Sequence, residues 1–426
     1  MRQIVCWFGA GCGSRTSSSE PNREVIILLA TYIVPLENAV YCMNGATGDP
    51  VTSEVEGPIL KDTYRYWLYE YEHPDAASVL YHLDSVLRQH PKVKLNVVIA
   101  SSVFGLNERF QSSTREGFEA RVNGNSNIFR LRIEKKGEIE EGVPAVGDVL
   151  GLRFGDTPVY VLISDHVTQF VKSVLGPFLN SYYPDVSRVY LSSVELFLLL
   201  RRLQEKSEGK ILIDRLTAYS RLKATHRQNR TEVTYTEEPF GDIFKRLLEN
   251  DQWVDKIRFS LFASDGSYQM SGYLSRYGFF RCKNSFSIFY QTAITDAVKM
   301  ASRKLRAFAN RNRSAEQPTP QKLEIDYEYD IFQAKEQMSR LIEAIASMKF
   351  TSMSIYHRNP YLHVSVLDYL DGSSYDVWVV TANKIHIVPQ IQASAASLAR
   401  LVNHVFESFR EGNIEGYASS SEIALR

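Results

Sequence analysis

The clearest candidates for catalytic residues lie in the first half of the chain, where Glu134, Lys135 and Lys136 end an apolar run. At this E-x-K spacing, the carboxylate of a metal-dependent nuclease binds the cation and the lysine stabilises the developing charge. Such a site needs a second carboxylate at a strand end. However, Asp75 precedes a predicted helix and Asp148 follows the motif. A nuclease therefore remains an alternative to an ordinary exposed strand end, and we predict no catalytic residue.

No other segment carries a complete catalytic or cofactor motif. Gly9–Ser14 partly matches a dinucleotide fingerprint, but Ser14 replaces the third glycine and no predicted helix follows to hold a pyrophosphate. The sequence contains no nucleophile elbow, Walker loop or His-Glu-x-x-His helix. Its four cysteines form no Cys-x-x-Cys pair, so we predict no zinc site and no disulfide framework, and expect a reducing cytoplasm.

Positive charge is concentrated in two segments of an otherwise neutral chain. Because 49 lysines and arginines balance 49 aspartates and glutamates, any attraction to nucleic acid must come from a local patch. A clustered basic stripe is the footprint of nucleic-acid binders. The alternative is a solvated helix end followed by a linker. We predict phosphate contacts from Arg201, Arg202, Lys206, Lys210, Arg215, Arg221, Lys223, Arg227, Arg230, Lys299, Arg303, Lys304, Arg306, Arg311 and Arg313.

The length of 426 residues is enough for two or three domains. Residues 1–42 differ in composition from the rest and are expected to form a poorly defined extension. Their apolar run, Val25–Val34, is too short to span a membrane. Residues 43–220 alternate helix-period and strand-period segments, which predicts an α/β domain. Within it, Gly105–Asn127 is polar and is predicted to be a long loop.

After residue 220, one order of elements occurs twice: strand, helix, four strands, helix. The first unit is predicted at 231–314 and the second at 321–412, followed by a tail at 413–426. Phe286–Tyr290 is expected to be the fourth strand of the first unit. The C-terminal half is thus predicted to be α+β, built from two tandem β-α-β4-α units.

This tandem order resembles the TATA-box-binding-protein fold, in which two such units join their sheets into one curved saddle. The resemblance covers residues 231–412 and implies helices on the convex side and an open face on the other. In that family the open face binds the DNA minor groove and inserts phenylalanines between bases. Strand alternation is expected to place on this face Arg258, Phe262, Tyr273, Tyr277, His363, Tyr369 and His386.

Together these patterns favour a non-catalytic nucleic-acid-binding subunit that uses the basic stretches beside a duplicated open sheet. One alternative is a protein-interaction scaffold, which would bind a protein partner or a second copy through the same face. The metal-dependent nuclease is the other. His357, His363 and His386 are expected to be surface residues rather than metal ligands. We predict no cofactor and no contact with a membrane.

Overall fold

The structure, a computed structural model, describes part of the chain, all of it within one compact unit, Glu56–Arg426. The predicted extension at 1–42 and most of the predicted tail lie outside the described residues. The described residues are 75–102, 104–111, 115, 117–139, 141–221, 230–236, 238–309, 311, 321–358, 361–390 and 392–415.

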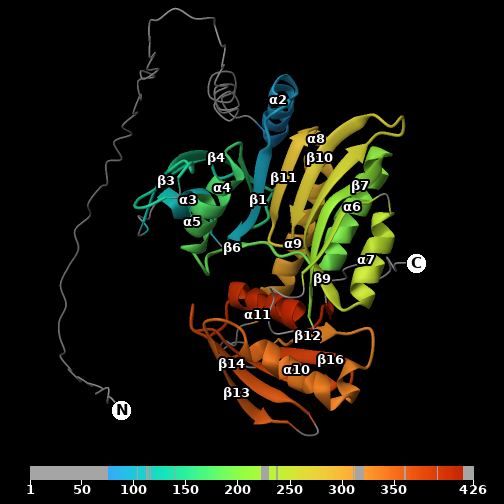
Figure 1. Cartoon of the computed structure of the whole chain (residues 1–426). Coiled ribbons are helices and arrows are strands. Elements are labelled where there is room, and N and C mark those ends of the chain that lie inside the picture. The colour runs from blue at the N-terminus through green and yellow to red at the C-terminus, as the bar shows by residue number, and fades with distance from the viewer. Residues whose placement is uncertain are drawn as a thin grey trace, which may run out of the picture. The chain divides into compact units, whose positions relative to one another are not determined.

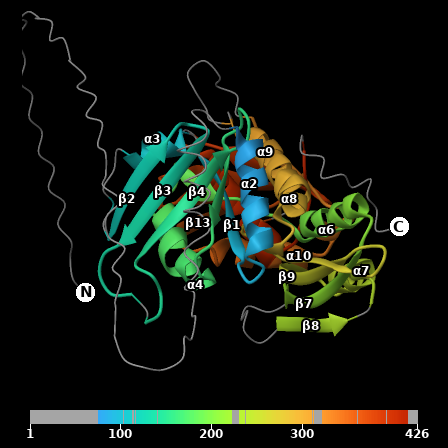
Figure 2. The same ribbon diagram turned by 90° about the horizontal axis from the view of Figure 1, so that it is seen from above.

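Two antiparallel sheets and their covering helices give this unit an α+β fold (Figure 1). Among the described residues, sheet A has eleven strands in the order β2-β3-β4-β5-β1-β11-β10-β9-β7-β8, with β6 paired to β1. Figure 2 shows β2 and β3 at one end of this sheet and β7 and β8 at the other. The strands are β1 (Leu95–Ser102), β2 (Phe118–Gly124), β3 (Ile128–Lys135), β4 (Val146–Arg153), β5 (Val159–Ser164), β6 (Val186–Arg188), β7 (Lys210–Ser220), β8 (Arg230–Thr236), β9 (Gln252–Phe262), β10 (Tyr268–Ser275) and β11 (Phe279–Asn284).

The helices that accompany sheet A include several predicted from their apolar periodicity. Two longer helices each contain one π-helical segment, η1 in the first and η2 in the second. Ser192 and Glu195 form a capping box at the start of α6, which fixes where that helix begins. The helices are α2 (Ala76–Gln89), α3 (Leu106–Gln111), α4 (Thr168–Phe170), η1 (Val171–Leu175), α5 (Gly176–Asn180), α6 (Ser193–Ser207), α7 (Phe240–Glu249), α8 (Phe286–Phe289), η2 (Tyr290–Ile294) and α9 (Thr295–Phe308).

Sheet A runs across the boundary expected between residues 220 and 231. Strand β1 pairs with β11, with Val97 opposite Phe280, so segments from both sides of the boundary share one sheet. Strand β7 was not predicted, because its segment was assigned only as part of a basic stretch. Its apolar residues Ile211, Ile213 and Leu216 are nevertheless buried in the core, and the strand pairs with both β8 and β9.

Two further predictions in this region are wrong. Phe286–Tyr290 is not a strand but the start of a helix, because Phe286, Phe289 and Ala293 recur at helical spacing and are buried on one face. The expected loop Gly105–Asn127 contains α3 and the edge strand β2. The side chains of β2 are mostly half-exposed or exposed, which explains its polar sequence.

Sheet B belongs to the second predicted unit and follows the expected order of strand, helix, four strands and helix. Its strand order is β13-β14-β15-β16-β12-β17. The strands of the first unit lie in sheet A instead, so the described residues do not form the predicted joined saddle. The elements are β12 (Leu323–Asp326), η3 (Ile331–Gln333), α10 (Lys335–Ala346), β13 (Thr351–His357), β14 (His363–Asp368), β15 (Ser374–Thr381), β16 (Lys384–Pro389), α11 (Ala395–Ser408) and β17 (Asn413–Ile414).

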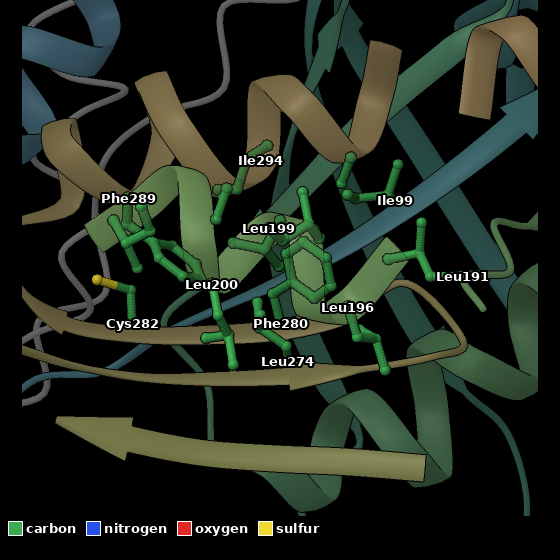
Figure 3. Close-up of a cluster of buried hydrophobic side chains, with 14 of the residues drawn as sticks. Ile99, Leu191, Leu196, Leu199, Leu200, Leu274, Phe280, Cys282, Phe289 and Ile294 are labelled. Carbon is green, nitrogen blue, oxygen red and sulfur yellow. The ribbon is translucent and has the colours of Figure 1, made fainter. Parts of the chain in front are cut away.

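The hydrophobic cores decide which faces of sheet A are covered. One face is packed along its length, and Figure 3 shows side chains from α6, η2 and three central strands meeting there, among them Leu199, Ile294 and Phe280. On the other face, α3, α4, η1 and α5 cover only the end formed by β1 to β5. The other half of this second face is formed by β7 to β11, and Arg258 projects from it. Among the described residues, no hydrophobic cluster covers this half. We call that half the open face of sheet A.

A buried ionic cluster connects sheet B to sheet A. Arg276, which is fully buried, donates to Glu411 at 2.7 Å, and Arg221 lies 3.4 Å from the same carboxylate. The backbone N–H and hydroxyl of Ser193 also donate to Glu411. Figure 1 shows α11, which precedes this glutamate, beside α9. Charged side chains therefore hold the end of α11 against sheet A.

Candidate nucleic-acid interface

A cavity rich in cations lies on the open face of sheet A, beside α4 and η1. Its volume is about 260 Å³. Among the described residues, ten line it: six are lysine or arginine, two are aromatic, two are threonine and none is acidic. We call it the cationic cavity. Its lining residues are Thr168, Lys172, Arg215, Thr217, Arg230, Lys256, Arg258, Tyr273, Phe279 and Arg281.

Strand pairing brings the lining side chains together from five strands, β7 to β11. Arg258 on β9 lies opposite Arg215 on β7 and opposite Tyr273 on β10, and Tyr273 in turn lies opposite Arg281 on β11. Because side chains alternate between the two faces of a strand, Lys256 projects on the same side as Arg258. Ile257 and Phe259, on the other side, are buried in the core.

The wall of the cationic cavity comes from the helix that covers the neighbouring part of the sheet. Thr168 lies on α4 and Lys172 on the π-helical segment η1, a type of segment often found at functional sites. An Nη1 atom of Arg281 donates to Thr168 Oγ1 at 2.9 Å, and that hydroxyl faces Asn96 Oδ1 at 3.4 Å. These contacts fix the Arg281 guanidinium at the junction of helix and sheet.

Carboxylates near the cavity neutralise only part of its charge. Glu232 accepts from Arg215 at 2.7 Å and also pairs with Arg230. Asp214 lies 3.6 Å from Arg258, and Asp255 lies 3.7 Å from Lys256. Among the described residues, three carboxylates therefore pair with lining cations, and six lining cations leave an excess of three positive charges.

The cations also repel one another. Burial lowers the pKa of Arg281, and the nearby charge of Arg258 lowers it further. The pKa of Lys94, just before β1, is likewise lowered by burial and then by Arg281, Arg258 and Lys283. Clustered charges of one sign raise the energy of the empty site, so binding of an anion would relieve this repulsion.

Thr217 supplies an unused polar group. Its side chain is fully buried and lines the cationic cavity. Its Oγ1 atom has no hydrogen-bond partner in the part of the chain that the structure describes. A buried hydroxyl without a partner costs about 1–3 kcal/mol, so a ligand oxygen that accepts its proton would gain from the contact.

Two aromatic side chains complete the lining. The rings of Tyr273 and Phe279 lie 5.5 Å apart and are tilted by 58°, and the Arg281 guanidinium lies 5.4 Å from the centre of the Tyr273 ring. Burial raises the pKa of Tyr273 to about 12, so its phenol remains protonated at neutral pH. The cavity thus offers cationic and hydroxyl donors beside an apolar ring surface.

The first predicted basic stretch is divided between several environments. Arg215 and Arg230 line the cationic cavity, whereas Lys210 lines a different cavity beside Phe262. Arg221 is buried in the ionic cluster. The remaining described members of this stretch, on α6, lie near acids: Arg201 with Glu205, and Arg202 and Lys206 with Asp296. Lys223 and Arg227 lie outside the described residues.

The second predicted basic stretch does not reach the cationic cavity. Lys304 is buried and pairs with Glu195, and Arg311 donates to backbone carbonyls, so both have structural contacts. Lys299, Arg303 and Arg306 are exposed on α9, a helix whose buried residues pack on the opposite, covered face of sheet A. Arg313 lies outside the described residues.

The remaining residues predicted on the open face are also dispersed. Tyr277 lies in the turn after β10, and its hydroxyl donates to Glu407 of α11 at 2.5 Å. In sheet B, His363 stacks on Trp378 with ring centres 3.5 Å apart, and His386 lies 3.4 Å from Glu324. Tyr369, which directly follows β14, is exposed.

Six lining residues were not predicted from the sequence, although the alternation of residues in two of their strands indicated which face they occupy. Lys256 and Arg258 alternate with buried residues on β9, and Phe279 and Arg281 do the same on β11. Such alternation marks one face of a strand. The contributions of Thr168, Lys172 and Thr217 depend on long-range packing, which no local pattern shows.

The residues considered for a metal-dependent nuclease either form ion pairs with other side chains or are exposed. Asp148 accepts two hydrogen bonds from Arg130, at 2.9 and 2.7 Å, and Lys136 lies 3.2 Å from Glu119. Glu134 is exposed on β3. No group of three or more potential metal ligands occurs within the described ranges. In the same ranges, no helix is both long and apolar enough to cross a membrane.

No protein-family model, no curated protein and no solved structure matches the chain.

Proposed function

We propose that this protein binds nucleic acid and that the phosphate contacts are made in the cationic cavity of sheet A. The observation that carries the proposal is the convergence of six cations, from the helical segment η1 and four strands, on one cavity whose described lining residues include no acid. Phosphate contacts by lysine and arginine supply most of the affinity in sequence-independent nucleic-acid binding.

The aromatic residues favour nucleic acid over a purely acidic ligand. Tyr273 and Phe279 lie among the cations, and bases stack on aromatic side chains in proteins that bind single strands. The proposal retains Arg215, Arg230, Arg258 and Tyr273 from the sequence-based prediction. It does not depend on a TATA-box-binding-protein-like saddle, and the basic residues of α9 have no role in it.

The salt dependence of binding tests the proposal. For a fluorescent single-stranded 12-mer, we expect the affinity to fall roughly 20-fold between 50 and 200 mM NaCl, as neutralisation of three phosphates predicts. The dissociation constant would be measured by fluorescence anisotropy with the full chain. Absence of binding at 50 mM NaCl, or an affinity that does not change with salt, would contradict the proposal.

A further inference from the structure

We infer that the cationic cavity recognises a phosphomonoester dianion: the terminal phosphate of a nucleic-acid strand or the phosphate of a free nucleotide. The inference rests on the proposed function, because it names the part of the nucleic acid that enters the cavity. The size, charge and hydroxyl groups of the cavity each support it.

The size of the cavity favours the end of a nucleic-acid strand over an internal phosphate. A volume of about 260 Å³ lies just below the usual range for small-molecule sites, roughly 300–1,000 Å³. An internal phosphodiester carries a sugar on each side, so the strand would have to enter and leave the same small space. A terminal phosphate has a single ester link and can enter with only its own sugar behind it.

The positive charge of the cavity also favours a phosphomonoester over a phosphodiester. The six lining cations and their three neighbouring carboxylates leave an excess of three positive charges. A phosphomonoester carries about −1.5 to −2 at pH 7, whereas each internal phosphodiester carries −1. A single terminal phosphate therefore neutralises more of the excess than a single internal phosphodiester does.

The donors are arranged on several sides of the space. Arg258 and Arg281 lie on either side of Tyr273 across adjacent strands, so their Cα atoms are about 10 Å apart at the usual strand spacing. Both long side chains can therefore converge on one phosphate. Thr217, opposite Lys256 on the neighbouring strand, adds a hydroxyl whose proton has no acceptor among the described residues. Phe279 leaves an apolar surface for the sugar or base that follows.

The test compares single-stranded 12-mers of one sequence that carry a 5′-phosphate, a 3′-phosphate or hydroxyls at both ends. We expect at least one phosphorylated form to bind about tenfold more tightly than the hydroxyl form at 100 mM NaCl. In Thr217→Val, which replaces the hydroxyl with a methyl group, this preference should fall to about threefold or less.

Thr217→Ser retains the hydroxyl and should restore the preference, which separates loss of the donor from altered packing. Thermal unfolding of both variants would show whether they fold. If Thr217→Val does not fold, Arg281→Gln replaces it, with the same expected loss of preference.

The outcomes distinguish the inference from the proposed function. Equal affinity for phosphorylated and hydroxyl ends overturns the inference, while salt-dependent binding of all oligonucleotides would preserve the proposed function. A nucleoside 5′-monophosphate that competes as strongly as the phosphorylated 12-mer supports the phosphomonoester site and contradicts the proposed function. Absence of binding by every probe overturns both.

Discussion

Replacing Arg258 and Arg281 with glutamate in one variant is expected to weaken binding of a single-stranded oligonucleotide at least 100-fold at 50 mM NaCl. The two arginines lie on either side of Tyr273 in the cationic cavity, and each substitution changes the local charge by two. The excess of three positive charges would become a deficit, and like charges brought together cost several kcal/mol. Fluorescence anisotropy with a labelled 12-mer would measure the loss.

A matched control separates the cavity from the general charge of the protein. Lys299→Glu with Arg303→Glu makes the same change in net charge on α9, where both side chains are exposed. This variant should bind within about threefold of the wild type. A similar loss in both double variants would show that the total charge, and not the cationic cavity, determines affinity.

Arg276→Met is expected to lower the free energy of unfolding by about 3–5 kcal/mol, because removal of one partner leaves a buried charge uncompensated. The fully buried guanidinium of Arg276 donates to Glu411 and lies 4.3 Å from the Trp253 ring centre and 4.8 Å from that of Tyr190. Methionine occupies similar space but cannot pair with the carboxylate. Urea unfolding at pH 7 would measure the change.

The same cluster predicts sensitivity to acid. Burial alone would raise the pKa of Glu411, but Arg276 and Arg221 outweigh it, so the pKa is lowered in the folded protein. A lowered folded pKa adds stability above the ordinary glutamate value, and this stability is lost as the pH falls through the folded pKa. Glu411→Gln should therefore be less stable at pH 7 and lose less stability on acidification.

The double variant Arg276→Met with Glu411→Leu is the control, since removal of both charges should cost less than removal of Arg276 alone. A change of less than 1 kcal/mol in Arg276→Met would contradict the structural role assigned to the cluster.

Local periodicity was sufficient to predict most of the elements. The alternation in β14 and β15 is the pattern expected for strands of the second predicted unit, because each strand has one buried face. Phe286–Tyr290 was mistaken for a strand because a short apolar run does not distinguish a buried strand from the first turn of a buried helix. Pairing between β1 and β11 depends on residues far apart in the sequence, so the shared sheet was not predicted.

The candidate site could be predicted only in part. Arg215, Arg258 and Tyr273 were identified in separate segments, but the pairing of β7 with β9 and of β9 with β10 brings them together. Clustering in sequence did not ensure clustering in space: Arg221 and Lys304 belong to basic stretches, yet both are buried in ion pairs. Ion pairing of this kind depends on acids from distant segments, which a local count of charge does not include.

Ultraviolet crosslinking of a single-stranded oligonucleotide to the full chain, followed by mass spectrometry of the modified peptides, tests the location of the nucleic-acid site most directly. We expect adducts on Tyr273 or Phe279, and their loss in the Arg258→Glu, Arg281→Glu variant. Adducts confined to the exposed aromatics of sheet B, such as Tyr356 and Trp378, or to peptides from α9, would contradict binding in the cationic cavity.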